Sequence, residues 1–260
     1  MSHEDRSGGT VRPTEGGAAI LPYARTVLNA LDAIRQTTDE LAGLVRGHLT
    51  LGMLGSISTP RVDLPGLLAG FHGKHPGIEI TLWEGSSDQL LTGVRHGHLD
   101  LALVSLGPQA PAGDIAIRIL ATEPVVVAVN VTHPLARRKT VTVDSLREHA
   151  LITLPPGTGI RAHIDAACAA AGIAVRIAFE VGDPRLAAEL AGQGLGAALL
   201  PASAAHSQSA ALTILPLTSP RIEGRIALAA RAEGPASPAT RAFLRHADLV
   251  FSLPPNGGRT

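Results

Sequence analysis

The sequence lacks the features that direct a chain to a membrane, to an anionic polymer or into an oxidising compartment. Its 22 Lys and Arg balance 22 Asp and Glu, so no overall positive charge attracts nucleic acid or anionic lipid. Cys168 is the single cysteine, which excludes an internal disulfide. No run approaches the roughly 18 consecutive apolar residues of a membrane span, and the polar N-terminus does not resemble a signal peptide. We therefore expect a soluble, cytoplasmic protein with no membrane partner.

A helical apolar stripe runs through the N-terminal part of the chain. The positions are spaced by alternating steps of four and three, with the polar Thr38 at one of them, and the apolar members are Ile20, Ala24, Val27, Leu31, Ile34, Leu41 and Val45. This spacing is typical of a coiled-coil seam. We predict a dimerisation helix that ends at Gly47 and whose contacts are made by Val27, Leu31, Ile34, Leu41 and Val45. An amphipathic helix packed on its own domain is the alternative.

Strand and helix signals alternate along the rest of the chain. The whole sequence has 260 residues, 45% of them hydrophobic, and is therefore long enough to bury a sizeable core. The first run predicts strands at 48–54, 78–83 and 100–104, with helices ending near 74 and spanning 88–96. The second run predicts strands at 123–129, 151–154, 175–181 and 197–200, with helices ending near 171 and spanning 184–191. A strand at 225–230 and a helix at 238–251 follow. This order predicts an α/β fold of two lobes joined by crossing strands, with ligand sites beyond the carboxyl ends of the strands.

Patterns for catalysis or metal binding are absent from the sequence. It contains neither a G-x-S-x-G elbow nor a P-loop. The histidine pairs at 72/75 and 96/98 lack the Cys, Asp or Glu that would complete a zinc site at close spacing. The glycine-rich segment 192–196 follows a helix and precedes a strand, the reverse of the dinucleotide-binding order, so we interpret it as a helix stop and turn. We expect no enzyme activity, no catalytic residue, no metal and no cofactor.

Loops rich in Ser, Thr and Gly follow strands in both halves of the chain, at 55–59, at 85–87, at Ser105 and at 157–159. Free N–H groups at helix starts, assisted by hydroxyl groups, suit a small anion such as a carboxylate. Each loop alone could be an ordinary helix cap. Their recurrence in two lobes predicts that they meet one ligand in a cleft. Arg161 and Arg185 lie beside these loops and could pair with a carboxylate, although arginines on helix surfaces are commoner.

Several short segments carry a family resemblance. They are residues 10–17 followed by 21–24, then 47–52, 71–80 around His75-Pro76-Gly77, 97–102, 133–135, and 193–196 followed by Leu200-Pro201. In this order, and over about Asp5 to Phe251, they resemble the LysR-type transcriptional regulators. The resemblance implies a two-lobed effector-binding domain of the periplasmic-binding-protein-like (type 2) kind, behind a dimerising linker helix. It also implies a small-molecule effector between the lobes and a homodimer or tetramer.

The resemblance further implies a division of the chain and a set of ligand contacts. The parts are the end of a winged helix-turn-helix wing at 1–17, a linker helix at 18–46, an effector-binding domain at 47–252 and a flexible tail at 253–260. Lobe I would comprise about 48–122 and 225–252, and lobe II about 123–224. The implied ligand contacts are Ser56, Ser58, Thr59, Ser86, Ser105, Thr158, Gly182, Asp183 and Pro201.

The sequence departs from the family at its start, where only about residues 5–17 of the DNA-reading head are present. Arg6 and Arg12 could contact phosphate, but base reading needs a complete helix-turn-helix. We therefore expect promoter DNA as a partner only if a complete head is supplied. The predicted function is the sensing and oligomerising part of a LysR-type regulator that binds a small carboxylate. The alternatives are a solute-binding protein of a transport system and a headless partner that blocks intact relatives from binding DNA.

Overall fold

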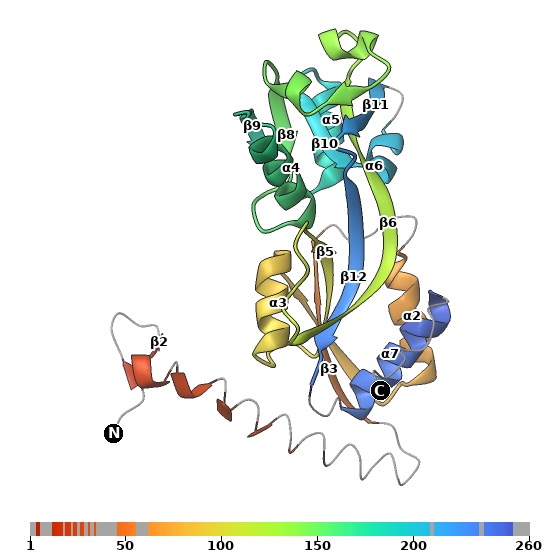
Figure 1. The fold of residues 1–260 in the computed structure, drawn as a ribbon. Coiled ribbons are helices and arrows are strands. Elements are labelled where there is room, and N and C mark those ends of the chain that lie inside the picture. The colour runs from red at the N-terminus through yellow and green to blue at the C-terminus, as the bar shows by residue number, and fades with distance from the viewer. Residues whose placement is uncertain are drawn as a thin grey trace.

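The protein, described by a computed structural model, has two lobes that follow an N-terminal helical stretch (Figure 1). The structure describes residues 4–5, 12–17, 19–21, 23–24, 27–28, 31, 34, 46–55, 62–208, 211–233 and 237–251. A short antiparallel pair, β1 (Glu4–Asp5) and β2 (Arg12–Pro13), comes first. The described residues between 15 and 34 are helical and lie apart from the lobes in Figure 1. No described helix is long and apolar enough to span a membrane.

Lobe I is built on three parallel strands, β3 (Gly47–Met53), β4 (Ile78–Glu84) and β5 (Leu101–Leu106). The helices α2 (Leu64–Lys74) and α7 (Pro238–Val250) share a core with one face of this sheet, and α3 (Ser87–Arg95) packs on the other face. Because helices cover both faces, every residue of β5 is buried. Its odd-numbered residues Leu101 and Leu103 face α2 and α7, whereas Ala102, Val104 and Leu106 face α3.

Two strands run between the lobes. β6 (Ile115–Asn130) and β12 (Glu223–Arg231) pair with each other as far as Pro124, and β12 also pairs with β5. From Val125 onward β6 pairs instead with strands of lobe II. Figure 1 shows β6 passing from one lobe into the other. The sequence predicted a strand only from residue 123, so the strand begins eight residues earlier than expected, and its first half completes the sheet of lobe I.

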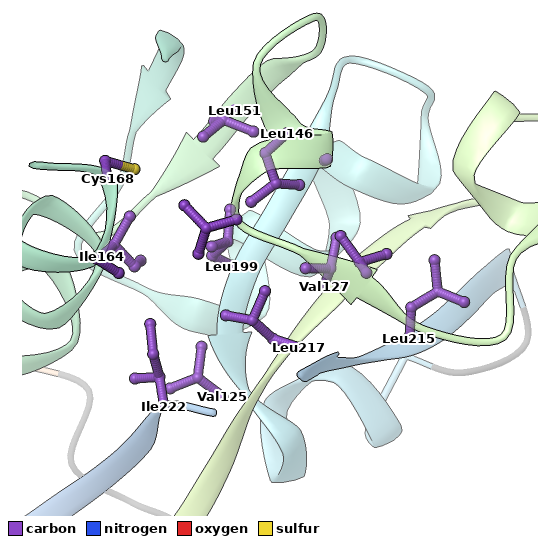
Figure 2. Close-up of a cluster of buried hydrophobic side chains, with 14 of the residues drawn as sticks. Val125, Val127, Leu146, Leu151, Ile164, Cys168, Leu199, Leu215, Leu217 and Ile222 are labelled. Carbon is purple, nitrogen blue, oxygen red and sulfur yellow. The ribbon is translucent and has the colours of Figure 1, made fainter. Parts of the chain in front are cut away.

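Lobe II surrounds the second half of β6. Its strands are β7 (Val141–Thr142), β8 (Ala150–Thr153), β9 (Arg176–Glu180), β10 (Ala197–Pro201) and β11 (Leu212–Ser219). Its helices are α4 (Gly159–Ala170), α5 (Pro184–Gly192) and α6 (Ala202–His206), with 3-10 turns η1 (Pro134–Arg137) and η2 (Asp144–Leu146). Figure 2 shows the core on the α4 side, where Ile164, Leu151 and Leu199 pack together and Cys168 is buried, as its alanine-rich surroundings predict.

The observed topology confirms the predicted fold class, an α/β chain of two periplasmic-binding-protein-like lobes. The strand order β4-β3-β5-β12-β6-β10-β8-β9 runs continuously through both lobes. Segment 192–196 is the predicted helix stop: α5 ends at Gly192, and Gly194 has a φ of +80°, which favours glycine. The prediction for Ser105 was wrong. Ser105 was expected in the loop after its strand, but β5 continues to Leu106, so Ser105 lies within the strand.

Candidate functional site

A cavity of about 1090 Å³ lies between the two lobes. Lobe I supplies the carboxyl ends of β3 and β4, the first turns of α2, and Ser105, while lobe II supplies the loops that precede α4 and α5 and the start of α6. Ala121, Glu123 and Ile226 of the crossing strands line it as well. The volume lies just above the range of about 300–1,000 Å³ that is common for small-molecule sites, so the cavity has room for a small ligand. A second cavity of about 810 Å³ lies within lobe I, beside Trp83 and His98, and contains none of the predicted ligand residues.

Six of the nine predicted ligand residues come together around the interlobe cavity, although they belong to five separate segments of the chain. They are Ser86, Ser105, Thr158, Gly182, Asp183 and Pro201. Ser56, Ser58 and Thr59 lie outside the described residues. Gly55, which directly precedes them, lines the cavity. Ligand contact by any of the nine stays a prediction.

Ser105 combines burial with an unsatisfied hydroxyl group. The residue is 7% exposed, and its Oγ has no hydrogen-bond partner within the described part of the chain. Its backbone N–H donates to Ser87 Oγ at 3.0 Å. The sheet register places Ser105 beside Ile226, which is itself beside Ala121, and all three residues line the cavity. A buried polar group without a partner is costly, so a partner supplied by a ligand would be favourable here.

The N-terminus of α4 lies directly against Ser105. A Cβ atom added to Gly159 would stand 2.5 Å from the backbone oxygen of Ser105 and 2.4 Å from that of Leu106. The N-cap residue Thr158 makes no side-chain cap, because its Oγ1 donates instead to the Pro155 carbonyl at 2.9 Å. The first N–H groups of this 12-residue helix therefore lack a side-chain acceptor. Together with the Ser105 hydroxyl, they form an arrangement that can bind an anion.

Two other helix starts at the cavity, those of α3 and α5, are capped by side chains. Ser86 forms a capping box at α3, in which its Oγ accepts from Gln89 N–H and Gln89 Oε1 accepts from Ser86 N–H. At α5, Asp183 Oδ1 accepts from the backbone N–H of Arg185 at 2.9 Å. The ordinary capping role therefore accounts for Ser86 and for Asp183, although the Ser86 hydroxyl can still donate its proton to a ligand.

Charged side chains of the cavity are mostly acidic. Glu84, Glu123 and Asp183 line it, together with the single described cation Arg185. Glu123 Oε2 accepts from Ser203 N–H at 3.0 Å, which fixes the carboxylate of the crossing strand against the start of α6. Neither Glu123 nor Ser203 was predicted as a site residue from the sequence. Glu123 could have been noticed because it places an acid beside Pro124, directly before the apolar stretch 125–129 of β6.

Arg161 is committed to other side chains, and it is not among the described residues that line the interlobe cavity. Its Nε lies 2.9 Å from Asp165 Oδ1, its Nη1 lies 2.5 Å from Glu180 Oε1, and it also donates to the Leu154 carbonyl. Only 11% of the side chain is exposed. Burial opposes the charge, but the hydrogen bonds to Glu180 and Asp165 outweigh it and raise the pKa of Arg161.

The remaining predicted residues lie in the N-terminal part of the chain. Val27 and Leu31 of the helical stripe are 59% and 49% exposed, so their own chain does not bury them. Ile34 is exposed as well. Leu41 and Val45 lie outside the described residues, as does Arg6. Arg12 belongs to β2, and its side chain is outside the described part. Neither the dimer contact nor the phosphate contact is therefore tested, and both stay predictions.

Sequence comparison decides the family. The family pattern of the LysR substrate binding domain matches residues 42–250, which include both lobes and the cavity. The chain belongs to the LysR family. This confirms the resemblance found in the short segments, and it identifies the two lobes of this LysR-type regulator as its effector-binding domain.

Relatives of this LysR protein include regulators and ligand-bound domains. The transcriptional dual regulator GltC of Bacillus subtilis is 28% identical over 250 residues, which cover 95% of this chain and 82% of GltC. The regulatory domain of CcmR from Synechocystis, solved in complex with 2-PG, is 26% identical with a TM-score of 0.67, covering 80% of this chain and 99% of that one. The effector binding domain of QuiR in complex with shikimate has the same fold, with 23% identity, a TM-score of 0.66, and coverage of 80% and 98%.

Proposed function

We propose that this chain is the sensing part of a LysR-type transcriptional regulator and that it binds a small carboxylate in the interlobe cavity. The observation that carries the proposal is the buried Ser105 hydroxyl, which has no hydrogen-bond partner among the described residues and lies beside the side-chain-uncapped start of α4. A carboxylate accepts from both kinds of donor, and the helix dipole favours its charge. Shikimate, the ligand in the QuiR structure, carries a carboxylate, which supports the same ligand class here.

Effector binding would act on transcription through the arrangement of the lobes. The ligand would touch Ser105 of lobe I and α4 of lobe II at once, so its affinity would differ between lobe arrangements, and that difference would shift their populations. The N-terminal helix would pair two chains through Val27, Leu31, Ile34, Leu41 and Val45 and pass the change to DNA-reading heads. Ser56, Ser58 and Thr59 would complete the ligand contacts from lobe I.

A thermal-shift experiment tests the ligand class. Benzoate and shikimate would be compared with their neutral counterparts, benzamide and methyl shikimate. A ligand at 100 times its Kd stabilises the folded state by about 2.7 kcal/mol, which corresponds to a rise in Tm of roughly 5–10 °C for a domain of this size. We expect a rise with a carboxylate and none with its neutral counterpart. If a wide panel of aromatic and aliphatic carboxylates leaves Tm unchanged, the proposal is wrong.

Ser105→Ala separates a ligand role from a structural one. Since the Ser105 hydroxyl has no hydrogen-bond partner among the described residues, its removal should leave the unliganded Tm unchanged or slightly higher. Affinity for the carboxylate should nevertheless fall. Ser87→Ala is the matched control, because Ser87 Oγ accepts the Ser105 N–H and its loss should lower the unliganded Tm. Equal carboxylate affinity in Ser105→Ala and the parent protein would show that the Ser105 hydroxyl does not bind the ligand.

A further inference from the structure

Arg185 is the one basic side chain among the described residues that line the interlobe cavity. It is exposed, and it takes part in none of the ion pairs within the described part of the chain. Glu189, one helical turn further along α5, is the nearest acid along the helix, but its Oε1 accepts from Gln208 Nε2 at 3.3 Å. The Arg185 guanidinium is therefore not committed to another described side chain.

The fold gives no reason for an arginine at this position. Arg185 lies in the first turn of α5, at the positive end of the helix dipole, where a cation is unfavourable and an acid is the usual choice. The Asp183 cap uses only the backbone N–H of Arg185, which a residue of almost any type would supply. The charge of this side chain is unfavourable at the start of α5, and its guanidinium is not needed for the cap of that helix. This combination points to a role outside folding.

The neighbouring acids limit what Arg185 can attract. Glu84, Glu123 and Asp183 line the same cavity, so its described side chains carry three negative charges and one positive charge, a net charge of 1 − 3 = −2. One carboxylate can pair with Arg185. A second anionic group on the same small molecule would have no cation to pair with and would lie among these carboxylates, which repel it.

We propose that Arg185 is the cationic partner of the effector carboxylate and that the cavity selects effectors with a single anionic group. This inference rests on the proposed carboxylate function and narrows it. Arg185 approaches from lobe II the same carboxylate that accepts from Ser105 and from the start of α4. The effector is thus a monocarboxylate whose other groups are neutral or cationic, and dicarboxylates and phosphorylated acids are rejected.

The first test measures binding of benzoate, shikimate and phthalate by calorimetry to the full chain. Phthalate is benzoate with a second carboxylate. In the parent protein we expect a monocarboxylate to bind at least tenfold more tightly than phthalate. Arg185→Gln should weaken monocarboxylate binding about tenfold to hundredfold, as expected for loss of a charge-assisted hydrogen bond. Arg176→Gln is the control, because it removes an exposed cation of lobe II that does not line the cavity.

Unfolding without ligand shows whether each variant is folded, and Arg185→Lys, which keeps the charge, should restore part of the affinity. If a carboxylate binds the parent and Arg185→Gln equally, Arg185 is not the anchor, while the proposed function stands. If phthalate binds as tightly as benzoate and shikimate, the single-charge selection is wrong. If no carboxylate binds the parent, both proposals fail together.

A double-mutant cycle tests whether Ser105 and Arg185 hold one carboxylate. Two residues that bind the same group lose less in combination than the sum of their separate losses. We expect the Ser105→Ala, Arg185→Gln double variant to bind the monocarboxylate several-fold more tightly than the product of the two single effects predicts. Strict additivity would place the two residues on different ligand groups and would overturn the assignment to a single carboxylate.

Discussion

Gly159→Ala is predicted to destabilise the protein by disturbing the contact between the lobes. The new Cβ would stand 2.4 Å from the Leu106 backbone oxygen and 2.5 Å from that of Ser105, about 1 Å closer than ordinary van der Waals contact. Because the obstructing atoms belong to the backbone of a buried strand, they cannot rotate away as a side chain would. The start of α4 must therefore move away from β5.

The expected loss is about 2–3 kcal/mol, within the range measured for overpacked cores. It opposes the stabilisation of about 0.5–1 kcal/mol that Gly→Ala gives inside a helix, so the sign of the result identifies the dominant effect. For a domain of this size the loss corresponds to a fall in Tm of roughly 4–12 °C. Carboxylate affinity should fall as well, because the N–H groups of α4 would move away from Ser105.

Urea unfolding and calorimetric titration of the variant test this reasoning. Gly73→Ala is the matched control, since Gly73 also lies in a helix and a Cβ there would meet no atom within 4 Å. It should stabilise the protein by up to about 1 kcal/mol. A Gly159→Ala protein at least as stable as the parent would refute the claim that α4 and β5 are held in close contact.

Two further predictions concern protonation and assembly. His246 of α7 is buried against Phe71 of α2. Burial, then the charge of Lys74, lowers the pKa of His246 from 6.5, and a hydrogen bond with the Leu67 backbone opposes this only in part. The unfolded chain therefore binds more protons below pH 6.5, so stability present above that pH is lost on acidification. His246→Leu should reduce the loss measured by urea unfolding between pH 8 and pH 5.5, and an unchanged loss would exclude His246 as a source. Leu31→Lys should shift the protein toward a monomer in light scattering, whereas Ala19→Lys, off the apolar stripe, should not. If the two variants have the same molecular mass in solution, the stripe does not form the interface.

Much of the fold follows from local patterns. The strands at 48–54 and 78–83 alternate clearly, and the helices that follow carry recognisable caps, so their order predicts two α/β lobes. Residues 115–122 were missed because they form a strand only by pairing with β12, which lies more than 100 residues later in the chain. α6 and β11 were also missed, since they depend on packing against β6.

The candidate site was predictable in its positions and not in its chemistry. Loop composition and the family resemblance placed Ser86, Ser105 and Thr158 near one cleft. Sequence gives no measure of the burial of Ser105 Oγ, and it does not show that Thr158 leaves α4 without a side-chain cap. The sequence also does not show that Arg161 forms ion pairs while Arg185 does not among the described residues, because Glu180, a partner of Arg161, lies on the neighbouring strand β9.

The position of β12 between β5 and β6 determines when each lobe can be completed during synthesis. Lobe II takes its strands from within residues 125–219, so its sheet can close while the end of the chain is still inside the ribosome. The sheet of lobe I waits for Glu223–Arg231, and its core also waits for Phe243. Until Glu223–Arg231 has been synthesised, β5 and the first half of β6 present unpaired edges, which are prone to aggregation. Nonsense mutations that remove the chain from residue 221 onward should therefore yield insoluble product.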